Sequence, residues 1–395
     1  MSATDAPQRV PLAEVADLMA PGQPLPFRVL DAFGRLLLAQ GQRIHDVRQL
    51  QALLERGASV ERDEVQQARA ARAAAATGGS RVPSTTRELT WFDHFDQQIW
   101  VLDDLLRALG KNEAREGVRA DLAAQLAAFG EHFIALVERQ PDAALFHAVR
   151  QDDKRCALYA LTHALHAATV VQLAARQLGW PAAQVRSAVF AALTMNAAIV
   201  ELQGRMAEQK ESPSKAQVDV IRAHPHRAAE RLAAAGIADA AWLDAVRDHH
   251  ERPVGGYPRG VEPGELARLV RAADVYTAKI SPRAIRAAQT PQAAARQLFQ
   301  DEGGGPLAAA LIKAVGVYPP GDLVTLKNGE TAVVVARTAV GNAPQVAVLF
   351  SAQGKPVAGA PRRDTTQGET AIAGPLADRS RVTRVLPEAV YGLLR

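Results

Sequence analysis

The chain has 395 residues, of which 48% are hydrophobic, 5% aromatic and 22% charged, and its formal net charge is +4. This length suits two or three domains, and the hydrophobic fraction excludes a generally disordered chain. The basic residues are dispersed among acidic ones and form no Lys/Arg stripe with interleaved aromatics, which excludes nucleic acid as the main partner.

Cysteine usage and hydropathy indicate the compartment. The single cysteine, Cys156, cannot form an internal disulfide, as expected in a reducing cytosol. No apolar signal core follows the N-terminal MSATDAPQRV, and the longest charge-free helical stretch, about 187–200, is too short to span a bilayer. We therefore expect a cytoplasmic protein without a membrane span.

Residues 1–65 are predicted to form a small N-terminal α/β module. Residues 27–41 contain two apolar runs around a turn, which predicts a hairpin, and a short helix should follow near residues 47–56. Residues 66–90 are predicted to be a linker, because an Ala/Arg tract there runs into Gly-Gly and Ser-containing turn sequence near residues 77–86.

The rest of the chain is predicted to be helical until it reaches a β-rich end. Apolar residues at helical spacing predict a helical connector over 91–150, and helices separated by Gly and Pro continue over 151–317. Residues 318–395 are predicted to form a β-rich unit, since β-branched residues flank the turn dipeptide Asn328-Gly329 and a further strand follows at 345–350.

Several histidines and one aspartate are candidates for metal binding. They are His163, His166, His224, His249, His250 and Asp274. Imidazole and carboxylate suit Fe, Mn, Zn or Ni, and ligands from several helices can converge in a bundle core. Two alternatives stay open: His163 as a ligand or a core histidine, and Asp274 as a ligand or the partner of a buried histidine or of Arg271.

The sharpest local motif is DHHERPVGGYPRG, residues 248–260. Adjacent histidines end a helical stretch, and a Gly-Gly-Tyr-Pro loop follows. Glycines let the backbone approach a ligand closely, and a tyrosine offers a ring for stacking. The predicted ligand-binding residues are Gly255, Gly256, Tyr257, Pro258 and Arg259.

This motif resembles the HHE…GYP signature of HD-GYP proteins, which are bacterial cyclic di-GMP phosphodiesterases of the HD superfamily. The resemblance covers about residues 153–335, and includes segments 161–180, 223–232 and 266–281 in the order of the family. It implies a mainly α fold: an HD-domain-like helical bundle with a small N-terminal α/β module and a small β-rich C-terminal unit.

The resemblance also implies a two-metal site in which His163, His224, His249, His250 and Asp274 are ligands. A His-Asp doublet should complete that site. Its positions fall on Met195 and Asn196, and the family's phosphate-contacting lysine falls on Ile199.

These departures remove the chemistry that the doublet supplies. Methionine is a poor ligand for a hard, oxygen-bridged site, and the neutral Asn196 cannot replace a bridging carboxylate. Tyr159 stands where the family has a third-metal glutamate, and the loop has Pro253-Val254 where the family has Asp-Gly. No residue is therefore assigned as catalytic.

The expected function is that of a bacterial signalling protein with impaired catalysis. It would bind cyclic di-GMP or a related nucleotide, or a protein partner. We expect at most one divalent transition metal (Fe, Mn, Ni or Zn) at His224, His249 and His250, or none. Two alternatives stay open: an active metal-dependent cyclic di-GMP phosphodiesterase, and a structural scaffold.

Overall fold

The computed structural model describes most of the chain. The described residues are 8–19, 25–30, 34, 36–38, 40–41, 44, 50, 53–54, 57–77, 90–110, 116–151, 158–252, 261–379, 382 and 385–393. They form two compact units, Met1–Trp100 and Val101–Arg395, and each is described by itself. The finer division into five parts remains a prediction.

The first unit contains a four-stranded antiparallel sheet in the order β1-β4-β2-β3. Its strands are β1 (Arg9–Pro11), β2 (Val29–Leu30), β3 (Leu36–Leu38) and β4 (Ser59–Glu61). Val29 lies opposite Leu38, which confirms the hairpin predicted over 27–41. The helix predicted near residues 47–56 lies largely outside the described residues.

Helices flank this sheet. A 3-10 helix, η1 (Leu12–Leu18), follows β1, and α2 (Arg62–Thr77) follows β4. The predicted linker therefore begins as helix, because its Ala/Arg tract has high helix propensity. Arg28 is nearly buried beside β4 and pairs with Glu61 at 3.0 Å and with Glu64 at 2.5 Å. The next helix, α3 (Trp91–Gly110), contains the boundary between the two units.

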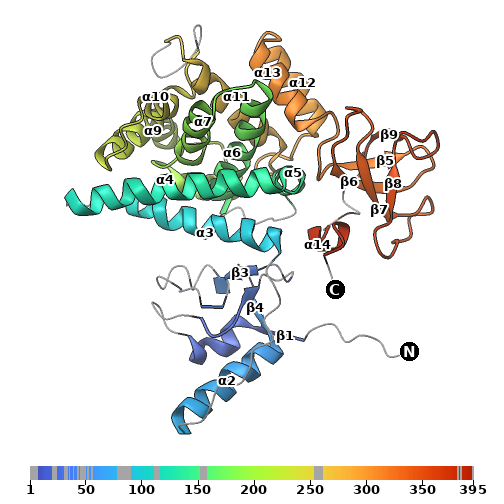
Figure 1. The fold of residues 1–395 in the computed structure, drawn as a ribbon, viewed down its shortest axis with the longest axis horizontal. Coiled ribbons are helices and arrows are strands. Elements are labelled where there is room, and N and C mark those ends of the chain that lie inside the picture. The colour runs from blue at the N-terminus through green and yellow to red at the C-terminus, as the bar shows by residue number, and fades with distance from the viewer. Residues whose placement is uncertain are drawn as a thin grey trace. The chain divides into compact units, whose positions relative to one another are not determined.

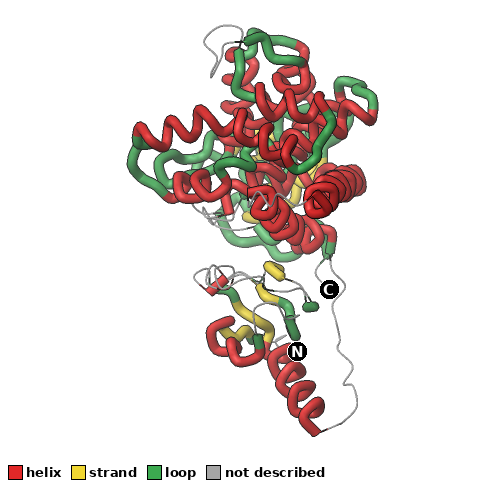
Figure 2. Tube along the Cα trace, turned by 90° about the vertical axis from the view of Figure 1, so that its left-hand side faces the viewer, coloured by secondary structure: helices red, strands yellow, loops and turns green. Residues whose placement is uncertain are grey.

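The second unit is mainly a helical bundle (Figures 1 and 2). Its remaining helices are α4 (Glu116–Arg139), α5 (Pro141–Arg150), α6 (Tyr159–Gln177), α7 (Ala182–Thr194), α8 (Val200–Glu208), α9 (Lys215–Ala234), α10 (Ala240–Asp248), α11 (Glu265–Ile280), α12 (Pro291–Asp301) and α13 (Pro306–Val315). Helix α6 is rich in apolar residues and is buried along most of its length, as expected of a central helix. It packs against α5, α7, α11 and α13.

A five-stranded antiparallel sheet follows the bundle, in the order β8-β7-β6-β5-β9. Its strands are β5 (Leu323–Leu326), β6 (Thr331–Ala336), β7 (Gln345–Phe350), β8 (Arg362–Asp364) and β9 (Ile372–Pro375), and a short helix, α14 (Pro387–Val390), comes last. Gly329 adopts a φ of 83° in the turn between β5 and β6, which confirms the predicted Asn-Gly hairpin.

A buried carboxylate joins this sheet to the bundle. Asp322, fully buried before β5, accepts hydrogen bonds from Gln292 of α12 at 2.7 Å and from Arg379 at 2.8 Å.

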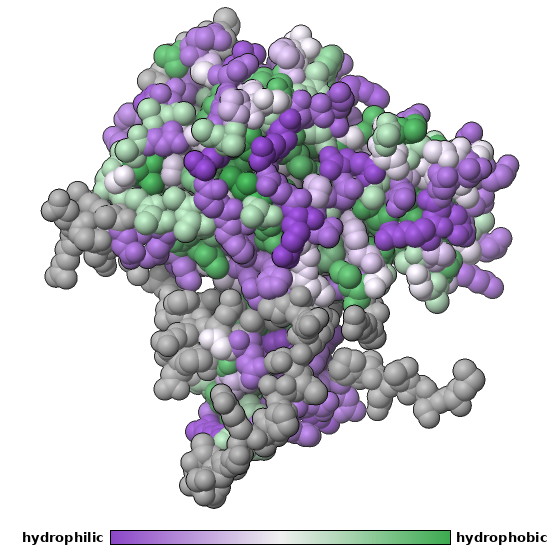
Figure 3. All heavy atoms as spheres, in the orientation of Figure 1, coloured by the Kyte–Doolittle hydropathy of each residue, from purple (hydrophilic) through white to green (hydrophobic). Residues whose placement is uncertain are grey.

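The helices and strands of the described residues confirm the mainly α fold class with small sheets. None of their helices has the length and apolarity needed to span a bilayer. On the face drawn in Figure 3, hydrophilic residues are interspersed with apolar ones.

Candidate metal centre

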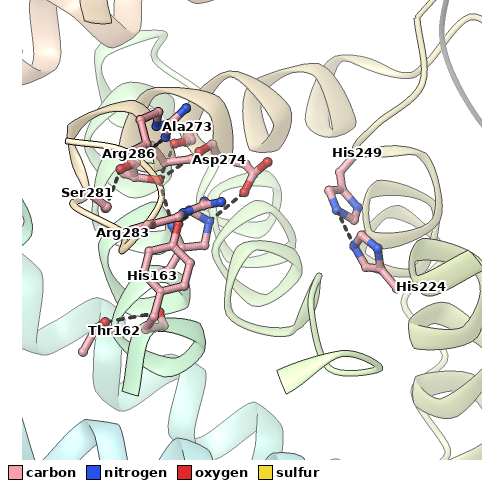
Figure 4. A network of polar contacts seen from close by, with 12 residues as sticks. Thr162, His163, His224, His249, Ala273, Asp274, Ser281, Arg283 and Arg286 are labelled. Carbon is pink, nitrogen blue, oxygen red and sulfur yellow. Dashed lines mark hydrogen bonds and ion pairs between the residues drawn. The ribbon is translucent and has the colours of Figure 1, made fainter. Parts of the chain in front are cut away.

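The buried His163 of α6 pairs with the half-buried Asp274 of α11. The His163 Nε2 atom lies 2.7 Å from Asp274 Oδ1 (Figure 4). Burial alone would raise the pKa of Asp274, but the hydrogen bond and charge of His163 outweigh it and hold that pKa well below its usual range. Arg271, the other partner considered for Asp274, instead forms an ion pair with Glu302.

Tyr159 covers the other face of His163. The two rings stack with their centroids 5.3 Å apart and their planes 14° from parallel. The Tyr159 hydroxyl accepts a hydrogen bond from Arg283, whose guanidinium carbon lies 4.5 Å from the centre of the ring. An aromatic ring with an arginine upon it therefore occupies the position where the resemblance implies a carboxylate ligand.

Three other histidines converge from α9 and from the end of α10. One ring nitrogen from each of His224, His249 and His250 lies within 4.8 Å of those of the other two. His224 and His249 are buried, and their Nε2 atoms are 3.3 Å apart (Figure 4). These three residues are called the histidine triad below.

Backbone carbonyls fix the orientation of two of these rings. The Nδ1 atom of His224 lies 2.5 Å from the Ile221 carbonyl oxygen, and that of His249 lies 2.7 Å from the Val246 oxygen. A carbonyl can only accept, so each Nδ1 must carry the hydrogen and each Nε2 must present a lone pair. The two Nε2 lone pairs consequently face each other.

The triad is neutral at pH 7. Burial and the neighbouring histidine lower the pKa of His224 to about 3 and that of His249 to about 3. Burial also lowers the pKa of His250 to about 4, although the charge of Asp274 opposes this shift. No proton therefore sits between the facing lone pairs, and a single divalent transition metal would satisfy them. The triad thus fits one such ion.

The positions that match the His-Asp doublet are packed into the core. Met195 and Asn196 are buried in the turn between α7 and α8, and Ile199 ends that turn. The preceding Thr194 accepts a hydrogen bond at 2.8 Å from the indole of Trp242. This turn contains no carboxylate, so it brings no bridging anion toward Asp274.

The structure separates the predicted site residues into groups. The histidine triad forms one cluster and His163 with Asp274 forms another, while Figure 4 shows the Asp274 carboxylate on the side of α11 that faces the triad. The predicted loop ligands Gly255, Gly256, Tyr257, Pro258 and Arg259 lie outside the described residues.

Sequence reasoning missed two features near the site. Arg283 contacts Tyr159 although 124 residues separate them, and nothing in the local sequence indicates this contact. His166 lies 3.0 Å from His147 of α5, where burial lowers the pKa of His166. The helical spacing of His163 and His166 could show only that both lie on α6.

Comparison with known proteins supports the resemblance. No family model matches the chain. Over 252 residues the chain is 30% identical to a protein named cyclic di-GMP phosphodiesterase PA4108 of Pseudomonas aeruginosa. The match covers 62% of this chain and 59% of that protein, so the chain spans about three fifths of the relative's length.

A solved structure described as Bd1817, a HDG"Y"P protein from Bdellovibrio bacteriovorus, also matches. Its TM-score is 0.42 and its sequence identity 14%, over 77% of this chain and 97% of that one. The sequence similarity to the Pseudomonas phosphodiesterase confirms the resemblance to HD-GYP proteins predicted from the motifs.

Proposed function

We propose that this chain is an HD-GYP-type signalling protein that binds a cyclic di-GMP-like phosphodiester but hydrolyses it slowly or not at all. The observation that carries this proposal is the buried turn with Met195 and Asn196 in the positions of the His-Asp doublet. Two cations a few ångströms apart need an anion between them, and this turn supplies none.

The remaining residues support binding at most one metal. The histidine triad would hold the ion, and a bound divalent metal would polarise a phosphoryl oxygen as a Lewis acid. Asp274 already accepts a hydrogen bond from His163, so its negative charge is partly satisfied without a metal. Loss of the second metal and the bridge should lower the rate by orders of magnitude.

A basic loop beside the site supports binding of an anion. Arg283 and Arg286 follow α11 on the side of His163 and Asp274 (Figure 4). The Nε atom of Arg283 is buried and has no hydrogen-bond partner among the described residues, so one donor of this guanidinium is unsatisfied. Guanidinium groups bind phosphate oxygens through charge-assisted hydrogen bonds. The residues 255–259 are proposed to add further contacts.

The proposal also includes a protein partner and a cellular location. Regulation through a protein partner and a cytoplasmic location follow from the signalling role and the single cysteine. The convergence of the histidine triad specifically favours a second candidate, a phosphodiesterase that works with one metal. A scaffold that binds neither metal nor nucleotide is the third candidate.

One sample can separate these functions. The purified chain is reconstituted with Fe, Mn or Zn and its metal content is measured. Binding of cyclic di-GMP is then measured by calorimetry, and its hydrolysis by nucleotide chromatography. We expect no more than one ion per chain, measurable binding and turnover near background. Ordinary turnover that a chelator abolishes would establish the enzyme, while neither binding nor turnover would leave the scaffold.

A restored doublet provides the matched comparison. The double variant Met195→His/Asn196→Asp reintroduces the ligand types that the resemblance implies. If their loss limits this site, the variant should hold more metal than the wild type and hydrolyse cyclic di-GMP faster. Two tightly bound ions in the wild-type chain would contradict the proposal directly.

A further inference from the structure

Pro225 lies inside α9, directly after His224. The helix continues from Lys215 to Ala234 through this proline, which is buried. Proline in a helix interior is strongly destabilising, because it has no amide hydrogen to donate and its ring crowds the carbonyl four residues earlier. A destabilising residue next to a triad histidine suggests that Pro225 has a function at the site.

The carbonyl four residues before Pro225 belongs to Ile221. In a regular α-helix that oxygen would accept the amide hydrogen of residue 225, which proline lacks. The Ile221 oxygen instead lies 2.5 Å from Nδ1 of His224. Pro225 thus leaves open an acceptor that the imidazole of the preceding residue uses.

His249 obtains the same kind of acceptor in another way. Its Nδ1 lies 2.7 Å from the carbonyl oxygen of Val246, in the last turn of α10, which ends at Asp248. The last four carbonyls of a helix have no intrahelical amide partner. His224 lies in the middle of a helix, where no terminus provides a free carbonyl, and Pro225 provides one there.

We propose that Pro225 is a positioning residue that fixes His224 with hydrogen on Nδ1 and a lone pair on Nε2. The Nε2 atom then points toward His249 Nε2 at 3.3 Å, in the direction that a shared ligand requires. An amide at residue 225 would compete for the Ile221 oxygen and release the ring. The metal part of this inference rests on the proposed function, whereas the tautomer part rests on the hydrogen bonds alone.

The test uses Pro225→Ala and Pro225→Val in the full chain. Both variants restore an amide, and the valine keeps more of the buried side-chain volume. Nitrogen-15 NMR of the imidazoles in the metal-free protein at neutral pH reports which nitrogen carries the hydrogen. We expect His224 to be protonated on Nδ1 in the wild type and to shift toward the Nε2–H form in both variants.

Metal affinity provides the second readout. Competition titrations with zinc should show roughly 10- to 100-fold weaker binding in both variants, as for other residues that orient a metal ligand. His226→Ala is the matched control, since this neighbouring side chain on α9 is 59% exposed and pairs only with Glu230 at the surface among the contacts described for it. The control should retain the wild-type tautomer and affinity, and circular dichroism verifies that each variant is folded.

The outcomes distinguish this inference from the proposed function. A tautomer shift in the variants of a chain that binds no zinc would support the role of Pro225 and contradict the metal proposal. An unchanged His224 tautomer in both folded variants would overturn the role of Pro225, whatever the zinc affinity of the wild type. If the wild-type chain binds zinc, equal zinc affinity in the variants would also overturn it.

Discussion

The buried polar side chains of the site differ in whether they satisfy one another. His163 donates a hydrogen bond to the carboxylate of Asp274, so the donor and the acceptor of this pair satisfy each other. In the triad, the Nε2 lone pairs of His224 and His249 face each other at 3.3 Å and cannot bond to each other. An unsatisfied buried acceptor is unfavourable, so the triad, and not the His163–Asp274 pair, should attract a cation.

Two alanine variants test this difference. His250→Ala removes one of the three triad nitrogens and should abolish retention of a metal, since two imidazoles hold a divalent ion poorly. His163→Ala leaves the triad intact and should retain most of the metal, although it deprives Asp274 of its partner. Metal content after dialysis, measured by mass spectrometry, provides the comparison. Equal retention in wild type and His250→Ala would mean that the triad packs without binding.

The sequence predicted part of this residue-scale picture. The adjacent pair His249 and His250 was recognisable because the motif is local. The pairing of Asp274 with His163 was one of two open alternatives, because spacing along α11 cannot specify a partner on α6. Contacts such as that of Arg283 with Tyr159 depend on the path of the loop after α11, which no local pattern encodes.

At the scale of elements, the packing of α4 against α7 depends on one glycine. Gly130 is buried in the middle of α4, and a Cβ atom there would lie 2.0 Å from Cε1 of Phe190 on α7. The Phe190 ring is itself held edge-to-face against Trp242, with centroids 5.1 Å apart. The ring therefore has little freedom to move aside.

Gly130→Ala should destabilise the bundle in spite of the better helix propensity of alanine. The propensity gain is about 1 kcal/mol, while overpacking costs about 1–3 kcal/mol and more when the neighbours cannot relax. We expect a net loss, seen as a lower denaturant midpoint. Gly110→Ala is the control, because its added Cβ would come no closer than 3.9 Å to Arg231. A Gly130→Ala variant as stable as Gly110→Ala would show that Phe190 can repack.

Element prediction succeeded where local patterns dominate. The helices expected over 91–150 include α4, Glu116–Arg139, because apolar spacing indicates that a helix is present. The Asn328-Gly329 hairpin was equally predictable from turn chemistry. The close approach of Phe190 to Gly130 was not, because a glycine within a helical pattern shows no partner until the helices are packed together.

At the scale of the whole molecule, the mainly α class followed from the spacing of apolar residues and from the resemblance to HD-GYP proteins. The buried link of Asp322 to Gln292 and Arg379 did not, since it joins segments up to 57 residues apart. Titration of buried groups is also a property of the whole folded molecule, because every shifted pKa changes its free energy of unfolding.

Acid should destabilise the metal-free protein well above the pH at which carboxylates titrate. The pKa values of His224 and His249 are lowered from 6.5 to about 3, and that of His250 to about 4. Between these values and 6.5 the unfolded chain binds more protons than the folded one. The free energy of unfolding therefore falls as the pH falls, by at most about 1.4 kcal/mol per pH unit for each histidine.

Two carboxylates modify this behaviour at lower pH. The lowered pKa of Asp274 contributes stability above pH 3.8 that is lost as the pH falls below that value. Burial raises the pKa of Asp322. Just above pH 3.8 this one carboxyl group therefore gains stability as the pH falls, which opposes the loss caused by the histidines. Between pH 6.5 and 5 the histidines should therefore dominate, and carboxylate titration should become visible only near pH 4.

Urea unfolding of the chelator-treated protein at pH 7, 6, 5 and 4, followed by circular dichroism, measures this dependence. The free energy of unfolding should drop by more than about 1 kcal/mol between pH 6 and pH 5. One buried histidine that stays neutral in the folded state is enough to cause a drop of this size. The double variant His224→Gln/His249→Gln should show a shallower slope, because two of the shifted groups are gone. Wild-type stability that stays constant from pH 7 to 5 would mean that the triad titrates at ordinary values and is open to water, which would contradict its burial.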